Sequence, residues 1–380
     1  MAEAFKDTFN NQFIDRFADR LQLIVGHFDR SDFAHRITGG DWENKAYKQR
    51  VNHMASVMGT ILPRDYKEAV ALLLDLLDKE REHLPDFSKI DDKDFQLLTL
   101  EYGAILDSYI AQYGLHDFET SVKAIEKITQ FTTCEFCVRP FIINYPNDMM
   151  KQMLAWSTHE HWGVRRLASE GCRPRLPWGM ALPHLKADPA PILPVLENLK
   201  NDPSRFVRLS VANNLNDIAK DNPNMVIDLA KRWHGASKDV DWVVKHGCRT
   251  LLKQGNREVM ALFGFDAGVK NIAVTDLQIQ TPEVTVGDFM AFSFNLLNNR
   301  SARTKIRLEY AIYYQKANGT LTKKVHKISE KEYAGNSVTT INRKHSFRVV
   351  TTRKLHPGLH QVAVVINGNE MGKLDFYLSE

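Results

Sequence analysis

Apolar residues recur at helical spacing through the first two thirds of the chain. Phe13, Phe17 and Leu21 lie four residues apart, and this periodicity predicts a helix within residues 5–28. The polar, glycine-containing stretch 27–42 is predicted to be a loop. Further helices are expected at about 45–61, 66–78, 95–112 and 118–130.

Between residues 131 and 264 the apolar pattern repeats. Successive core positions are separated by 26, 43 and 36 residues, close to the period of helical-pair repeats; they are Val138, Val164, Val207 and Val243. The longest interval contains six prolines within residues 174–194, and we expect an ordered loop there because proline blocks helix interiors. Repeats of this kind bury their apolar faces against each other. This part is therefore predicted to be an α-solenoid of HEAT-like helical pairs with a concave inner surface.

After Gly264 the apolar pattern becomes that of strands. Segments rich in Val, Ile, Tyr and Phe alternate with turn signals such as Asn367-Gly368. The clearest segments are 272–280, 289–297, 306–314 and 362–366. About seven strands in roughly 110 residues are typical of an antiparallel immunoglobulin-like β-sandwich. We therefore predict a multidomain chain, α then β, with a helical repeat domain at 1–265 and a sandwich domain at 268–380.

Composition indicates an intracellular protein. Hydrophobic residues make up 43% of the chain, but no run approaches the roughly 20 apolar residues of a membrane helix. The first residues alternate charge with apolar side chains, unlike a signal peptide. Cys134-x-x-Cys137 lacks the second cysteine pair that would complete a tetrahedral zinc site. We expect a cytoplasmic monomer with no membrane segment, no metal and no cofactor.

Charge is segregated along the chain. Lys and Arg number 16 against 23 Asp and Glu in residues 1–130, then 18 against 14 in residues 131–267 and 16 against 9 in residues 268–380. An acidic segment, residues 1–130, followed by a basic segment, residues 131–380, indicates a polyanionic partner for the basic segment. In the last part, the cations that prompt this hypothesis are Arg300, Arg303, Lys305, Arg307, Lys323 and Lys324.

Three acidic residues stand in successive repeats. Glu135 and Glu170 lie 35 residues apart in similar local sequence, and Asp217 follows in the next repeat. Trp178 stands in the proline-rich segment, where an aromatic ring can form one wall of a cleft. Carboxylates among arginines and aromatic rings are suited to a cation held next to a polyanion. The alternative is that each carboxylate pairs with a nearby arginine and only joins the repeats.

Basic residues crowd the starts of the inner helices. Arginine forks match phosphate oxygens, and helix N-termini add backbone donors, so a groove lined in this way would hold a DNA backbone. The predicted DNA-binding residues are Arg139, Arg165, Arg166, Arg173, Arg175, Arg208, Lys245 and Arg249. A solvated helix face is the alternative for each of them. The chain has no GxGxxG, Walker or G-x-S-x-G motif, so dehydrogenase, kinase and serine-hydrolase functions have no support.

Three runs in this region resemble one known family. CEFCVRPF, VRRLASEGCRPRLPW and FVRLSVANNLNDIAKDNP are similar to the AlkC branch of the AlkC/AlkD superfamily of HEAT-like DNA glycosylases. The resemblance covers residues 1–265, and the tail resembles the immunoglobulin-like domain of some AlkC proteins. It implies excision of 3-methyladenine and 3-methylcytosine from duplex DNA without extrusion of the base. By motif, Glu135, Glu170 and Asp217 resemble the catalytic carboxylates, Trp178 the aromatic residue beside the lesion, and Arg166 a residue that contacts the DNA backbone.

The chemistry of such lesions agrees with an acidic site. An N3-methylated base already carries positive charge and leaves without a general acid, so the barrier lies in the cationic character that builds on the deoxyribose. Nearby carboxylates stabilise oxocarbenium-like sugars and can orient the attacking water. Two alternatives stay open: a HEAT-repeat scaffold without enzymatic activity, and a DNA-binding protein that recognises alkylation damage without cutting.

Overall fold

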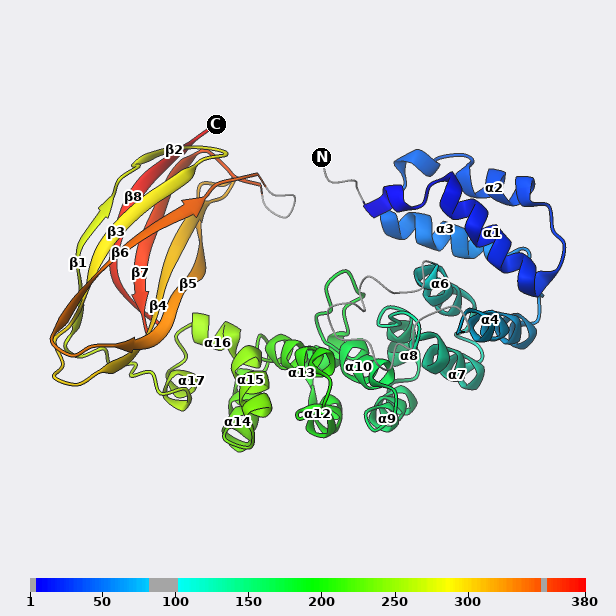
Figure 1. Cartoon of the computed structure of the whole chain (residues 1–380), viewed down its shortest axis with the longest axis horizontal. Helices are drawn as coiled ribbons and strands as arrows, with labels where there is room; N and C mark the ends of the chain where they lie inside the picture. Colours follow the sequence, from blue (N-terminus) through cyan, green and yellow to red (C-terminus); the bar gives the residue numbers. More distant parts are fainter. Residues whose placement is uncertain (1–4, 82–101, 350–353) are drawn as a thin grey trace. The chain divides into compact units, whose positions relative to one another are not determined.

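The computed structural model describes residues 5–81, 102–349 and 354–380. The described part begins with α-helices and ends with β-strands (Figure 1). The α-helices are α1 Asn11–Val25, α2 Arg30–Thr38, α3 Tyr47–Gly59, α4 Tyr66–Arg81, α6 Gly103–Tyr113, α7 Phe118–Ile128, α8 Val138–Asn144, α9 Pro146–Trp156, α10 Trp162–Gly171, α11 Pro183–Ala187, α12 Leu193–Leu199, α13 Arg205–Ile218, α14 Pro223–Trp233, α15 Lys238–Gly247, α16 Arg249–Lys253 and α17 Arg257–Leu262. Among the described residues, none of these helices combines the length and the apolar character needed to cross a bilayer.

The N-terminal helices follow the predicted pattern with one correction. The stretch 27–42, predicted to be a loop, contains helix α2. Asp29 caps this helix by accepting a hydrogen bond from the backbone N–H of Asp32, and Phe33 and Ile37 form a buried pair one turn apart. The three apolar residues of this helix, Phe33, Ala34 and Ile37, are too few to show a helical period in sequence. Of the predicted helix 95–112, residues 95–101 lie outside the described part.

The helical repeats form two layers. Helices α10, α13 and α15 pack side by side in the inner layer, while α9 and α12 contact each other in the outer layer (Figure 1). The four predicted core valines, at 138, 164, 207 and 243, are all fully buried. Hydrogen bonds from two tryptophans connect neighbouring helices. Trp156 Nε1 donates to Glu126 at 2.6 Å, and Trp233 Nε1 donates to Glu197 at 2.7 Å. The HEAT-like helical pairs are thus confirmed.

The proline-rich segment 174–194 is only partly a loop. Its second half forms α11, a 3-10 turn and the start of α12, each with a proline in its first turn. Proline is tolerated there because the first N–H groups of a helix have no intrahelical partner. The first half remains an exposed loop that carries Trp178, and that half alone fits the predicted loop.

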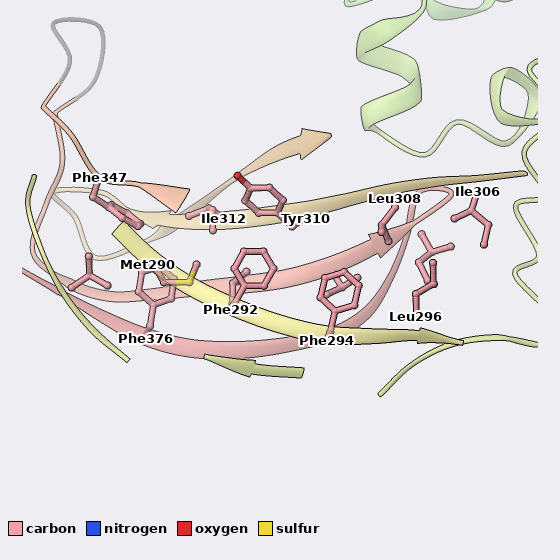
Figure 2. Close-up of a cluster of buried hydrophobic side chains, with 14 of the residues drawn as sticks. Met290, Phe292, Phe294, Leu296, Ile306, Leu308, Tyr310, Ile312, Phe347 and Phe376 are labelled. Carbon is pink, nitrogen blue, oxygen red and sulfur yellow. The ribbon is translucent and has the colours of Figure 1, made fainter. Parts of the chain in front are cut away.

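The β-strands form two sheets. Their bounds are β1 Ile272–Ile279, β2 Glu283–Thr285, β3 Phe289–Asn298, β4 Thr304–Gln315, β5 Leu321–Tyr333, β6 Ser337–Ser346, β7 Gly358–Ile366 and β8 Asn369–Ser379. One sheet has the order β1-β3-β6 and the other β2-β8-β7-β4-β5. All pairings are antiparallel except that of the short strand β2 with β8, which sequence did not predict. Alternate residues of β3, including Phe292 and Phe294, fill the core between the sheets (Figure 2).

Contacts divide the chain into two compact units. The first comprises Met1–Val226 and Trp233–Gly247, and the second comprises Ile227–Arg232 and Cys248–Glu380. Helices α16 and α17 therefore group with the sandwich. Within this second unit, Asn367 and Asn369 donate to backbone carbonyls of residues 266 and 267, each at 2.9 Å. The predicted division into domains at 1–265 and 268–380 stays a prediction.

Candidate active site and nucleic-acid interface

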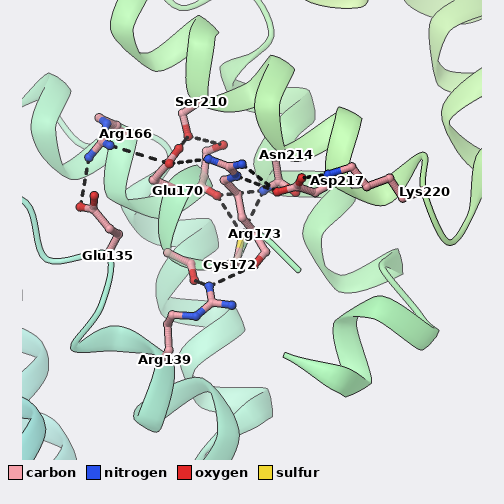
Figure 3. A network of polar contacts seen from close by, with 12 residues as sticks. Glu135, Arg139, Arg166, Glu170, Cys172, Arg173, Ser210, Asn214, Asp217 and Lys220 are labelled. Atoms are coloured by element: carbon pink, nitrogen blue, oxygen red, sulfur yellow. Dashed lines mark hydrogen bonds and ion pairs between the residues drawn. The ribbon is translucent and has the colours of Figure 1, made fainter. Parts of the chain in front are cut away.

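The three predicted carboxylates meet at one place in the first unit. Glu135 lies in the turn before α8, Glu170 is the second-last residue of α10, and Asp217 is the second-last residue of α13 (Figure 3). Repeat geometry explains this convergence, because equivalent positions of stacked helices lie on the same face. Their side chains are 12%, 9% and 2% exposed, so all three are largely buried and Asp217 is the deepest.

Glu170 is the most connected of the three. Its Oε1 accepts from Arg173 Nη1 at 2.7 Å and lies 3.9 Å from Arg166 Nη2, while its Oε2 accepts from the Ser210 hydroxyl at 2.6 Å. Burial alone would raise the pKa of Glu170, but the two guanidinium groups and the Ser210 hydroxyl bring it below its ordinary value. Glu170 is therefore ionised at neutral pH.

Arg173 and Arg166 each hold two carboxylates. Arg173 donates from Nε to Asp217 at 2.9 Å in addition to its bond with Glu170. Arg166 donates to Glu135 at 3.3 Å, and its guanidinium lies 4.4 Å from the centre of the Phe206 ring. Both arginines remain cationic, because the carboxylates raise their pKa values against the opposing effect of burial. Lys220, bonded to Asp217 at 2.9 Å, is a third, more exposed cation in the cluster.

Trp178 is the most exposed large side chain near the cluster. It is 73% exposed, and its φ angle of +62° lies in the left-handed region. The loop that carries it follows directly from Arg173, so the indole and the carboxylates belong to one continuous segment of chain. An exposed indole close to buried anions is suited to contact with a ligand that approaches from solvent.

Comparison with known proteins defines this region. Residues 45–251, more than half of the chain, match the model of the family described as DNA alkylation repair enzyme. The chain belongs to the DNA alkylation repair enzyme family. Residues 273–380 match a second model, described as the C-terminal Ig-like domain of uncharacterised protein YhaZ, which supports the immunoglobulin-like assignment of the sandwich.

Two relatives match this chain over almost its whole length. Uncharacterized protein YhaZ of Bacillus subtilis (strain 168) is 38% identical over 371 residues, which cover 98% of both chains. A solved structure of Pseudomonas fluorescens alkylpurine DNA glycosylase AlkC, bound to DNA containing an abasic site analog, matches with a TM-score of 0.89. The two chains are 32% identical and each is covered completely. The predicted resemblance to AlkC is thus confirmed, and so is the α-then-β architecture.

Two of the predicted DNA-binding arginines join neighbouring helical repeats. Arg165 donates to Asp202 at 2.6 Å and to the carbonyls of residues 159 and 160. Arg208, at the same position of α13, pairs with Asp239 at 3.1 Å and donates to the carbonyls of residues 202 and 203. Each arginine therefore ties its own helix start to an aspartate of the next repeat. We call these two contacts the inter-repeat pairs.

The remaining predicted DNA-binding residues differ in accessibility. Arg139 is fully buried and cannot reach a phosphate from its position. Arg175 is exposed but is paired through two bonds with Asp221, at 2.6 and 2.7 Å. Lys245 and Arg249 are half-buried in α15 and α16. The suggested DNA contacts of all eight residues stay predictions, and for Arg139 the geometry opposes one.

Several cations of the tail also pair with groups within the second unit. Arg300 pairs with Asp266, Lys305 donates to the carbonyl of residue 263 at 2.9 Å, and Arg307 is buried against Glu309 at 2.6 Å. Arg303 is exposed and Lys323 pairs with Glu370. The charge excess of the tail therefore overstates the number of cations that are available to DNA.

Sequence analysis missed several residues of the site. Ser210 and Lys220 bond to the carboxylates, yet neither belongs to a motif that would have singled it out. Asp107 lies with Cys134 and Cys137 in a buried group whose ligand atoms are all within 4.8 Å of one another. Burial raises the pKa of Asp107 to about 7, and the nearby Glu135 adds to this shift. This group is the one set of potential metal ligands found among the described residues, and the expected absence of a metal is untested.

Proposed function

We propose that the protein is a DNA glycosylase that excises cationic N3-alkylated bases, such as 3-methyladenine and 3-methylcytosine, from duplex DNA in base excision repair. The observation that carries the proposal is the cluster of three carboxylates at the ends of α10 and α13 and before α8, within a chain of the DNA alkylation repair enzyme family. The likeness to an alkylpurine DNA glycosylase over both complete chains supports alkylated purines as substrates.

Glu135 and Glu170 would act on the deoxyribose of the lesion. As the N-glycosidic bond stretches, positive charge develops on the sugar, and anions already in place stabilise it by several kcal/mol. These two carboxylates are the more exposed of the three, so either of them could also orient the attacking water. Asp217 would contribute its negative charge from beneath the surface, without touching the sugar.

The paired arginines do not argue against this role. A scaffold protein would also pair its carboxylates with arginines, as the alternative hypothesis expected. In the cluster, however, Arg166 and Arg173 are each shared between two carboxylates, and Lys220 supplies the third cation. Glu135 and Glu170, which share Arg166, would be the carboxylates that face an approaching sugar cation.

Trp178 supports recognition of the lesion without extrusion of the base. Its indole stands on an exposed loop, where it would meet the damaged nucleotide from outside the duplex. Contact between the indole face and a cationic base would add about 0.5–2 kcal/mol. Arg166, at the rim of the cluster, would contact the DNA backbone.

Release of free base from methylated duplex DNA tests the proposal. The full chain is incubated with DNA treated with a methylating agent, and the released bases are identified by mass spectrometry. We expect 3-methyladenine and 3-methylcytosine but no unmodified bases, because a neutral base is a poor leaving group. Tight binding to methylated duplex without release would favour a damage-recognition protein, and no preference for DNA would favour a scaffold.

A further inference from the structure

The loop that carries Trp178 has an unfavourable backbone conformation. The N–H of Gly179 bonds to the carbonyl of Leu176 at 3.1 Å, which makes residues 176–179 a tight turn with Pro177 second and Trp178 third. With φ of +62°, Trp178 occupies a turn position where glycine or asparagine is normally required. A bulky side chain in this region persists only when surrounding contacts hold it there, and such strain is concentrated at functional sites.

Arg139 holds both ends of this loop from beneath. Its Nη1 donates to the carbonyls of Gly171 at 2.8 Å and Arg173 at 3.0 Å, and its Nε donates to the carbonyl of Met180. The guanidinium is buried among these carbonyls, and its Nη2 finds no hydrogen-bond partner among the described residues. Burying a cation at this position costs free energy. The hydrogen bonds of Arg139 go to the backbone carbonyls of residues 171, 173 and 180.

Lys48 also forms a hydrogen bond with the loop. It stands in the first turn of α3, 130 residues earlier in sequence, and its ammonium donates to the carbonyl of Trp178 itself. The same ammonium lies 4.2 Å from the centre of the Phe136 ring, next to Glu135 in sequence. A cation is unfavourable at a helix N-terminus, so helix stability does not account for lysine at this position.

We propose that Lys48 and Arg139 are positioning residues, which together clamp the loop 171–180 and keep the Trp178 indole presented to the lesion. This inference rests on the proposed function for its catalytic consequence but not for the clamp itself. Neither residue touches the reacting atoms. Arg139 sets the path of the loop, and Lys48 bonds to the peptide carbonyl of Trp178, the residue of this loop with positive φ.

The clamp is tested with Lys48→Met, Lys48→Arg and a control, Lys151→Met. Lys151 is an exposed helical lysine of the same unit, 78% exposed, which pairs only with Asp148. The emission of Trp178 is obtained as the difference between each variant and its Trp178→Phe counterpart. We expect Lys48→Met to lower the fluorescence anisotropy of Trp178, because the freed loop moves faster than the whole protein, while Lys48→Arg and Lys151→Met keep the wild-type value.

Catalysis provides the second readout. Single-turnover excision by Lys48→Met should fall about tenfold, because a misplaced contact group costs one to two orders of magnitude. Affinity for undamaged duplex should stay within about twofold, and Lys48→Arg should recover most of the rate. Arg139→Lys, which keeps the charge but loses the fork, should loosen Trp178 further if it folds.

The two readouts separate the clamp from the proposed function. Wild-type anisotropy of Trp178 in Lys48→Met would overturn the clamp, whether or not bases are released. A loosened Trp178 in Lys48→Met, in a protein whose wild-type form releases no base, would support the clamp and remove the proposed function. A loosened Trp178 with an unchanged excision rate would show that the loop position does not matter to catalysis and would overturn the positioning role.

Discussion

Arg165 and Arg166 are neighbours in α10, yet they belong to two different kinds of ion pair. Arg165 forms an inter-repeat pair with Asp202, and its other donors are satisfied by two carbonyls before the helix. Arg166 points into the carboxylate cluster, where it faces both Glu135 and Glu170. Consecutive helical residues point about 100° apart, which is enough to separate the two environments.

The difference between them is how the partners are shared. In the inter-repeat pairs one arginine meets one aspartate, and the contact is complete without a ligand. In the cluster three carboxylates share two arginines and one lysine, and Arg166 and Arg173 each face two carboxylates. The same residue types thus form separate pairs in one place and a shared network around the proposed site in the other.

The largest expected effect separates the two kinds of pair by catalysis. Glu135→Gln or Glu170→Gln should lower single-turnover excision about 10²–10³-fold, because preorganised charge at the reacting centre is lost. Asp202→Asn removes the charge of an inter-repeat pair and should leave the rate of the folded protein nearly unchanged. Excision rates are measured at saturating enzyme, and circular dichroism confirms that each variant is folded. Equal losses of excision rate in all three variants would show that the cluster and the inter-repeat pairs do not differ in their effect on catalysis.

For the free energy of unfolding, we expect a large effect from an inter-repeat pair. Asp202 is buried, accepts from Arg165 at 2.6 and 3.1 Å, and also caps the backbone N–H of Ser204 at 2.8 Å. Asp202→Ala leaves the guanidinium without its carboxylate and should lower the free energy of unfolding by about 3 kcal/mol. Urea denaturation measures this change, and a loss below about 1 kcal/mol would show that the pair does not join the repeats.

Asp107 is a third kind of acidic residue. Its carboxyl group is buried, and burial raises its pKa. Its pKa of about 7 in the folded protein exceeds the unfolded value near 3.9. Its contribution to stability is therefore complete below about pH 4 and is lost as pH rises toward 7. Between pH 5.5 and 7 the free energy of unfolding should fall by about 2 kcal/mol. Asp107→Asn should remove this slope, and a variant with the wild-type slope would assign it to other groups.

The smallest effect is expected at the second inter-repeat pair. Asp239 is 57% exposed where it meets Arg208 at 3.1 Å, so solvent and salt screen the interaction. Asp239→Asn should cost less than about 1 kcal/mol, and high salt should abolish even that difference. Thermal denaturation at low and high ionic strength checks this. A loss of unfolding free energy as large as that of Asp202→Ala would show that solvent exposure does not determine the strength of the inter-repeat pairs.

Much of the repeat architecture could be predicted from sequence. The spacing of the core valines and the 35 residues between Glu135 and Glu170 follow from one helical pair per repeat, so the carboxylates could be placed together in advance. The partners of the arginines could not be, because neighbouring arginines such as Arg165 and Arg166 look alike in sequence. Whether an arginine meets Asp202 or Glu170 depends on its exact helical angle, and Lys48 lies 130 residues from its partner. Long-range polar contacts of this kind have no local signal.

The most direct test of a carboxylate cluster that stabilises a sugar cation is affinity for two duplexes that differ in one charge. One carries a cationic pyrrolidine in place of the lesion deoxyribose, and the other carries a neutral tetrahydrofuran. We predict that the wild-type protein binds the cationic duplex about tenfold more tightly, a difference of about 1.4 kcal/mol. Glu170→Gln should lose this preference and Asp202→Asn should keep it. Equal affinity of the wild-type protein for both duplexes would contradict the proposed role of the cluster.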